Sequence, residues 1–157
     1  MSDEIAKKIS TATVEAMKAK QPERVMTLRL MTSAIKQEEI NQRSENKRNA
    51  LTDDQILTVL ERMVKQRQDS IEQYQKANRD DLANKEKLEI EIIREFMPAL
   101  LSEQQLTAII DQCFAEIKPK GNSDMGLIMN YLKKHLKTGQ ADMRMVNTIV
   151  KNRLQNL

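Results

Sequence analysis

Histidine and cysteine, which often serve as general base and as nucleophile in enzymes, are scarce in this 157-residue sequence. His135 is the single histidine and Cys113 the single cysteine. Catalysis needs a nucleophile and a base held within hydrogen-bond reach of each other, and neither residue has such a partner at a recognisable spacing. Cys113 shares helical spacing with Ile109 and Ile117, which predicts a buried thiol. We therefore predict no catalytic residue and expect a structural or solvent-facing role for His135.

The sequence also indicates no metal and no cofactor. The HExxH pattern, which places two zinc ligands four residues apart on a helix, is absent. Three glycines in the whole chain scarcely suffice for a phosphate-binding loop. Glu86, Glu89 and His135 are an imaginable acid–base set, but no spacing supports it. We expect neither a metal-binding nor a cofactor-binding site.

Basic residues form the feature with the clearest chemical meaning. Residues 118–157 contain eight Lys and Arg against two Asp, whereas residues 1–117 contain 18 basic and 21 acidic residues. Lys133, Lys134 and Lys137 fall near the end of a predicted helix, where the helix dipole favours cations. Dipole capping explains one or two lysines but not all eight cations, and a phosphate-rich partner fits better. The pattern predicts binding to tRNA, and because Tyr131 is the one aromatic residue near the cluster, we expect recognition of backbone and shape.

Arg67 lies on an apolar stripe of a predicted helix. A buried arginine needs a carboxylate partner, and Glu38 and Glu89 are the candidates. The alternative is a groove lined by Arg29, Lys65 and Arg67 that binds an anion or an acidic peptide. The sequence pattern does not distinguish the two.

Apolar residues recur at intervals of three and four along most of the chain, which is the pattern of amphipathic helices. Pro22 and Pro98 interrupt this pattern, because a proline favours the first turn of a helix and disfavours helical geometry in the residue before it. The predicted helices cover approximately residues 5–21, 22–40, 53–76, 82–97, 103–117, 124–137 and 143–154.

Two capping boxes mark helix starts. Thr52 is followed three residues later by Gln55, and Ser102 by Gln105. In this motif the hydroxyl of the first residue accepts a hydrogen bond from the backbone amide three residues later. The side chain of that later residue accepts one from the backbone amide of the first. Each cap contributes about 1 kcal/mol to stability.

Other helix ends are less regular in sequence. Asp80 or Asp81 is the expected cap of the fourth helix, and Asp142 that of the last. Gly139 is expected to end the preceding helix in the left-handed conformation. Residues 41–50 are polar, which predicts a fraying helix end followed by an exposed loop.

Composition supports an all-α fold. Aromatic residues make up 3%, and the chain has three Gly and three Pro, too few for a β-sandwich or barrel. We predict an N-terminal helical domain, residues 1–98, and a small C-terminal three-helix bundle, residues 99–157. A single cysteine allows no internal disulfide, and neither a signal peptide nor an apolar stretch of membrane-spanning length is evident, so we expect a cytoplasmic location.

The first two thirds of the chain contain ordered motifs at 24–31, 34–36, 38–40, 51–53, 65–67, 69–71, 77–79, 96–98 and 100–103. In these motifs and their order the chain resembles the family of YqeY-like proteins. The last third resembles the domain that these proteins share with the tail of GatB, a subunit of the glutamine-dependent tRNA amidotransferase, at 124–126, 129, 137, 139, 141–142 and 146–147. The resemblance extends over essentially the whole chain.

This resemblance implies an all-helical fold with a C-terminal GatB/YqeY-type domain. The corresponding tail of the amidotransferase helps to hold tRNA. That role, together with the charge pattern, gives a candidate nucleic-acid-binding set: Lys133, Lys134, Lys137, Gly139, Gln140, Arg144, Asn147 and Lys151. The chain departs from the family pattern at Gln140, where a basic residue is expected, at Asn130, where lysine is usual, and at Thr138, which resembles an insertion in the turn.

Three functions compete at this stage. The leading hypothesis is a non-catalytic tRNA-binding accessory module, related to the amidotransferase and to tRNA-charging or amidation machinery. The alternative is a helical protein–protein adaptor, whose N-terminal module offers a groove to a partner helix and whose basic tail binds an acidic protein surface. The third is a ligase in its own right, because family members are labelled as carbon–nitrogen ligases with glutamine as amido-nitrogen donor.

Overall fold

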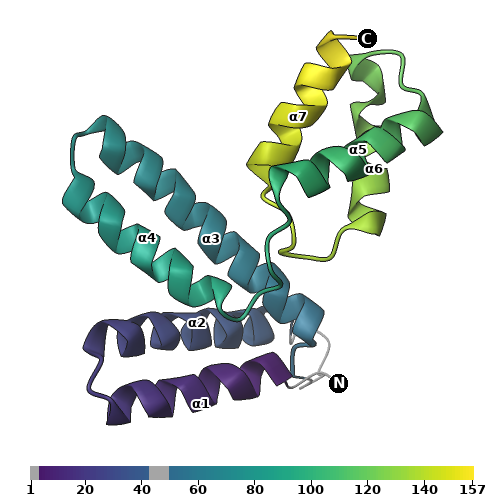
Figure 1. Cartoon of the computed structure of the whole chain (residues 1–157). Helices are drawn as coiled ribbons and strands as arrows, with labels where there is room; N and C mark the ends of the chain where they lie inside the picture. The colour runs from purple at the N-terminus through teal and green to yellow at the C-terminus, as the bar shows by residue number, and fades with distance from the viewer. Residues whose placement is uncertain (1–3, 43–49) are drawn as a thin grey trace. The chain divides into compact units, whose positions relative to one another are not determined.

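The computed structural model describes residues 4–42 and 50–157 (Figure 1). In these residues it contains seven α-helices, a short 3-10 helix at Asn122–Asp124 and no strand, which confirms the all-α prediction. No helix in the described ranges is both long and apolar enough to span a membrane. The helices are α1 Glu4–Lys18, α2 Pro22–Asn41, α3 Asp53–Lys76, α4 Asp80–Arg94, α5 Glu103–Ile117, η2 Asn122–Asp124, α6 Met125–His135 and α7 Met143–Gln155.

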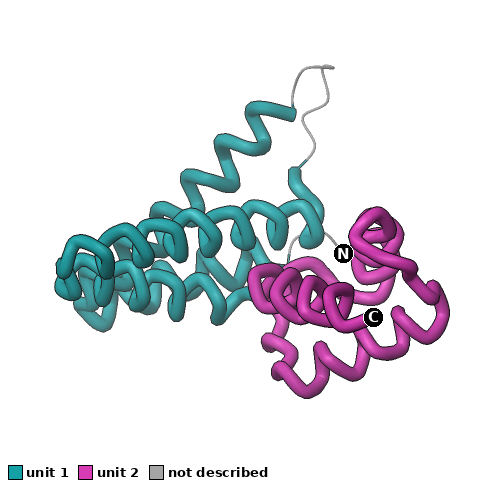
Figure 2. The backbone as a smooth tube through the Cα atoms, turned by 90° about the horizontal axis from the view of Figure 1, so that it is seen from above, with its two compact units in different colours: residues 1–97 teal, residues 98–157 magenta. Residues whose placement is uncertain are grey.

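The chain divides into two compact units, residues 1–97 and residues 98–157 (Figure 2). Each unit has its own apolar core. In the first unit, α1 and α2 form one helical hairpin, and α3 and α4 form a second (Figure 1). Its fully buried side chains come from all four helices and from the segment before α3: Ile9, Leu28, Met31, Leu51, Ile56, Leu60 and Ile93.

Both predicted capping boxes are present. The Thr52 hydroxyl accepts a hydrogen bond from the Gln55 amide at 3.2 Å, and the Gln55 side chain accepts from the Thr52 amide at 2.9 Å. The Ser102 and Gln105 pair repeats this arrangement at 3.1 and 2.9 Å. The sequence therefore predicts these two helix starts correctly, because a capping box depends on residues within one turn.

The ends of α4 differ from the prediction. Its N-cap is Arg79 and no side chain caps the helix. The Asp81 carboxylate accepts two hydrogen bonds from Arg79 at 3.2 Å, and this contact lowers the pKa of Asp81. The helix ends at Arg94, three residues before the predicted end, because the amides of residues 95–97 donate to carbonyls three residues back in 3-10 geometry ahead of Pro98.

The loop predicted within residues 41–50 lies largely outside the described residues. The helix end predicted at the start of this segment is observed, because α2 ends at Asn41. Asp124 is the N-cap residue of α6, but its side chain makes no capping hydrogen bond. Its carboxylate accepts from the Lys120 amide at 2.8 Å instead and closes the turn that precedes the helix.

Arg67 forms the ion pair expected of it, in a partly buried position. Its Nε lies 2.8 Å from Glu89 Oε2 and 3.9 Å from Glu86 Oε2, and its Nη1 donates to the Met63 carbonyl at 3.2 Å. The Arg67 and Glu89 side chains are only 13% and 14% exposed. Glu38, the other candidate partner, lies 3.6 Å from Arg62 instead. The alternative groove that included Arg67 is therefore wrong, because this guanidinium is bound between α3 and α4.

The second unit is built on α5. Its core contains one apolar face from each of α5, α6 and α7, namely Leu106, Ile110, Cys113, Phe114, Ile128, Leu132, Val146, Val150 and Leu154. Cys113 is fully buried, as predicted, and burial raises the pKa of its thiol. A neutral, inaccessible thiol does not act as a nucleophile near neutral pH.

We expect Arg67→Ala to lower the free energy of unfolding by about 2 kcal/mol, because it leaves the partly buried Glu89 carboxylate without its charged hydrogen-bond partner. Arg62→Ala is the matched control: Arg62 is 57% exposed, and loss of its exposed pair costs less than about 1 kcal/mol. Urea unfolding measures both values. Equal losses in the two variants would contradict a structural role for Arg67.

Glu86 gives a pH-dependent test. Burial, together with the neighbouring Glu89, raises the pKa of the Glu86 carboxyl. The folded protein then holds this proton more tightly than the unfolded chain, so ionisation of Glu86 opposes folding as pH rises above the unfolded-state pKa of about 4.3. We expect Glu86→Gln to increase the free energy of unfolding at pH 7 and to leave it nearly unchanged at pH 3. Glu91→Gln, at an exposed position of the same helix, is the control. If Glu86→Gln were less stable than the unchanged protein at pH 7, the raised pKa of Glu86 would be refuted.

Candidate nucleic-acid interface

Residues 136–142 form the loop between α6 and α7 (Figure 1). The Gln140 side chain helps to hold this loop. Gln140 Oε1 accepts from the Lys137 amide at 3.1 Å, and the Gln140 amide donates to the Lys137 carbonyl at 3.0 Å. The Gln140 carbonyl also accepts from the Leu101 amide at 2.9 Å, which ties the loop to the segment before α5. Gln140, a departure from the family pattern, thus has a defined structural role in this chain.

Gly139 gives the loop its shape. It occupies the third position of the Lys137–Gln140 turn with φ of 81° and is buried. A type II turn requires a positive φ at this position, which glycine adopts without steric cost. The left-handed conformation was predicted correctly, but the helix itself ends earlier, at His135, since Leu136 is extended and packs against the core.

Lys133, Lys134 and Lys137 lie at the end of α6 and in the turn that follows it, and all three are exposed. Within the described part of the chain, none of them forms an ion pair with a carboxylate. Lys133 and Lys134 complement the negative end of the helix dipole, and their ammonium groups remain available to an anion.

Arg144, Asn147 and Lys151 lie on the solvent-facing side of α7. They are spaced by three and four residues and are all exposed, whereas Val146 and Val150 are fully buried. The Asp142 carboxylate caps this helix as predicted, accepting from the Arg144 amide at 3.0 Å. The side chains predicted to contact RNA thus lie on the end of α6 and on one face of α7, two elements joined by a short loop.

Arg153 has a different role from the other cations of α7. It forms an ion pair with Asp111 of α5, and its guanidinium lies 5.0 Å from the centre of the Phe114 ring. This contact joins two helices of the core. The sequence did not reveal it, because the two partners are 42 residues apart.

The charge difference between the two parts of the chain is smaller when the chain is divided at residue 98, where the second unit begins, than at residue 118. Residues 98–157 contain eight basic and five acidic residues, whereas residues 1–97 contain eighteen of each. The three additional carboxylates are Glu103, Asp111 and Glu116, all on α5. The excess positive charge of the second unit therefore lies on α6, α7 and the segments beside α6.

The aromatic rings of His135 and Tyr131 stack on each other. Their rings stack with centres 4.0 Å apart and 14° between planes, and His135 Nδ1 lies 2.8 Å from the Tyr131 carbonyl oxygen. Desolvation and a hydrogen bond with Glu116 raise the pKa of the Tyr131 hydroxyl. His135 covers one face of the tyrosine ring, which leaves less of it for a nucleic-acid base. Among the described residues, no cluster of His, Cys, Asp and Glu is arranged to hold a metal ion.

Comparison with known proteins identifies the family. The family model described as "Yqey-like protein" matches residues 6–154. The chain belongs to the YqeY-like family. The family recognised from its motifs is thereby confirmed.

Several fungal proteins are similar to this YqeY-like chain, and three of them are called altered inheritance of mitochondria protein 41, mitochondrial. The one from Lachancea thermotolerans is 31% identical over 139 residues, which cover 87% of this chain and 72% of the relative. The one from Clavispora lusitaniae is 34% identical over 125 residues, covering 78% and 70%. The one from Vanderwaltozyma polyspora is 32% identical over 108 residues, covering 68% of this chain and 56% of the relative.

We expect Gly139→Ala to destabilise the second unit by about 1 kcal/mol, because alanine is strained at a φ of 81°. Gly126→Ala is the matched control. Nothing lies within 4 Å of a Cβ at Gly126 in α6, so alanine there should leave stability unchanged or increase it by up to about 1 kcal/mol. Thermal or urea unfolding followed by circular dichroism measures the pair. A neutral Gly139→Ala would show that the turn tolerates a side chain.

Proposed function

We propose that this YqeY-like chain is a non-catalytic accessory protein that binds tRNA through the α6–α7 basic surface. We define this surface as Lys133, Lys134, Lys137, Arg144, Asn147 and Lys151. The main support is that its four lysines are exposed and form no ion pair within the described residues. Lysines held by a rigid helical frame neutralise phosphates and release counterions, which is the chief source of affinity for nucleic acids.

Recognition would be of backbone and shape. Tyr131 is stacked on His135, and lysine contacts phosphate as a point charge without reading base edges. The resemblance of residues 124–147 to the tRNA-holding tail of GatB points to the same type of ligand. Gly139 and Gln140 belong to the proposal as residues that fix the loop between the two groups of cations.

A catalytic role has weaker support. Cys113 is buried with a raised thiol pKa, and His135 is stacked and hydrogen-bonded to its own helix. Neither is placed as the nucleophile or base that glutamine hydrolysis requires. Glutaminase activity of the purified chain, lost on substitution of either residue, would establish the ligase hypothesis in place of the accessory role.

The cytoplasmic location expected from the sequence stays a prediction. The names of the similar fungal proteins place those proteins in mitochondria. Both compartments contain tRNA, so the proposed ligand is the same in either.

Charge reversal tests the surface. We expect the triple variant Lys133→Glu, Lys134→Glu, Lys137→Glu to lose most tRNA affinity and to reduce the slope of log K against log salt by about 2 to 3, roughly one per phosphate contact removed. Filter binding or fluorescence anisotropy over a series of salt concentrations measures both quantities.

The control is the triple variant Lys65→Glu, Lys85→Glu, Lys87→Glu. These exposed lysines lie on α3 and α4, and the change in net charge is identical. A general charge effect would weaken binding equally in the two triples. Full tRNA affinity in the α6–α7 triple would refute the assignment of the surface.

A further inference from the structure

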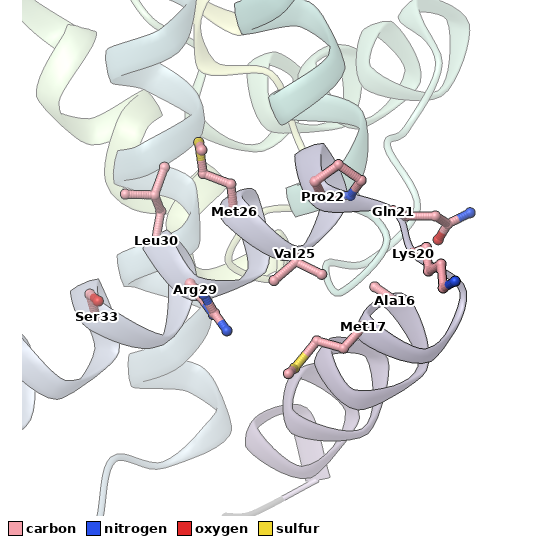
Figure 3. Close-up of a pocket in the computed structure, with 10 residues that line it drawn as sticks. All are labelled: Ala16, Met17, Lys20, Gln21, Pro22, Val25, Met26, Arg29, Leu30 and Ser33. Atoms are coloured by element: carbon pink, nitrogen blue, oxygen red, sulfur yellow. The ribbon is translucent and has the colours of Figure 1, made fainter.

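A groove of about 780 Å³ runs between α1 and α2 in the first unit (Figure 3). Both helices and the turn between them line it: Ala16, Met17, Lys20, Gln21, Pro22, Val25, Met26, Arg29, Leu30 and Ser33. The turn is rigidly formed. The Gln21 amide donates to the Ala16 carbonyl at 3.0 Å and the Lys20 amide to the Met17 carbonyl at 3.2 Å, the two bonds of a Schellman motif, with Lys20 at a φ of 56°.

Three of the apolar side chains that line the groove are exposed and not part of the core. Met17, Met26 and Leu30 are 52%, 58% and 43% exposed. On α2, Leu28 and Met31 are fully buried in the core, whereas Met26 and Leu30 lie on the opposite side of the helix. A surface helix of a globular domain normally has polar residues on that side. Apolar residues gathered around a groove are typical of an interaction site.

The ionisable side chains that line the groove are both cations. Lys20 lies in the turn and Arg29 on α2, and no carboxylate is among the lining residues. Neither cation has an ion-pair partner within the described residues. Arg24, near the start of the same helix, makes a bidentate contact with Glu95 at 2.5 and 3.1 Å. The groove thus combines an apolar floor with a positively charged edge.

We propose that this groove binds an amphipathic helix of a partner protein, whose apolar stripe is flanked by glutamate or aspartate. Laying an apolar helix face in a groove is a common mode of recognition, and the flexible Met17 and Met26 can repack around differing side chains. The lining part of α2, residues 22–33, is about 18 Å long, which matches about 12 residues of a partner helix. Carboxylates beside the stripe would pair with Lys20 and Arg29. This site is separate from the basic surface of α6 and α7 and does not depend on it.

Designed peptides test the chemistry directly. The probe is a peptide of about 20 residues, long enough to form a helix, with leucine at intervals of three and four and glutamate on both sides. The reference peptide has lysine in place of glutamate. We expect the full-length protein to bind the acidic peptide at least about tenfold more tightly, measured by fluorescence anisotropy.

Variants locate the site. We expect the affinity for the acidic peptide to fall by at least about tenfold in the double variant Met26→Ser, Leu30→Ser. The same loss is expected in the single variant Arg29→Glu. Because these side chains are exposed, the fold should persist. Leu88→Ser is the matched control: Leu88 is 52% exposed on α4, away from the groove lining, and its substitution should leave affinity unchanged. The Arg29→Glu protein should in turn favour the lysine peptide.

Three results would overturn the proposal. The first is no binding of the acidic peptide up to about 1 mM, the weak limit of specific association. The second is equal binding of the two peptides, which would indicate unspecific apolar contact. The third is displacement of the peptide by tRNA together with loss of tRNA binding in Arg29→Glu, which would assign the groove to the nucleic acid. Amide chemical shifts that change between residues 16 and 33 would support the site, and changes confined to other residues would contradict it.

Discussion

The second unit depends on one constraint: three short helices must bury their apolar faces together. α5, α6 and α7 have 15, 11 and 13 residues, and helices of this length are marginal on their own in water. Ile110, Ile128 and Val150 are completely buried where the three faces meet. Once these faces point inward, the polar residues at intermediate positions must point outward. The exposed lysines of α6 and the exposed stripe of α7 therefore follow from the packing of the core.

The same packing gives the basic side chains two different roles: some form ion pairs between helices, and others are exposed to solvent. Arg153 binds Asp111 and covers Phe114, so it belongs to the framework. Arg67 has a corresponding role in the first unit, where it joins α3 to Glu89 of α4. A count of basic residues along the sequence treats these arginines like any other. In the proposal, the anion-binding charge of the second unit resides instead in the four lysines and Arg144 of the α6–α7 basic surface, which are exposed.

Local features were the ones that the sequence predicted well. Helical periodicity and the boxes at Thr52 and Ser102 depend on residues within one or two turns, and the burial of Cys113 follows from its place on an apolar stripe. Asp80 and Asp81 misled the prediction, because an aspartate before a helix can pair with a neighbouring arginine as well as cap. The pairing of Arg153 with Asp111 was out of reach, since it depends on how α7 lies against α5. The adaptor hypothesis expected a groove in the N-terminal module, but the sequence did not locate it. Met26 and Leu30 are residue types common in cores, and only the packing of α2 shows that they face away.

Two surfaces of different chemistry result, one on each unit. The α6–α7 basic surface has cations on a polar background, which suits phosphates, whereas the α1–α2 groove has cations beside apolar side chains, which suits an acidic helix. Hydrogen exchange of the full-length protein with and without tRNA decides whether the α6–α7 basic surface has the proposed role. If it does, tRNA added at low salt slows exchange in residues 133–151, and this protection is lost as salt is raised. Protection confined to residues 4–42 or 50–97, or no protection at any salt concentration, would contradict it.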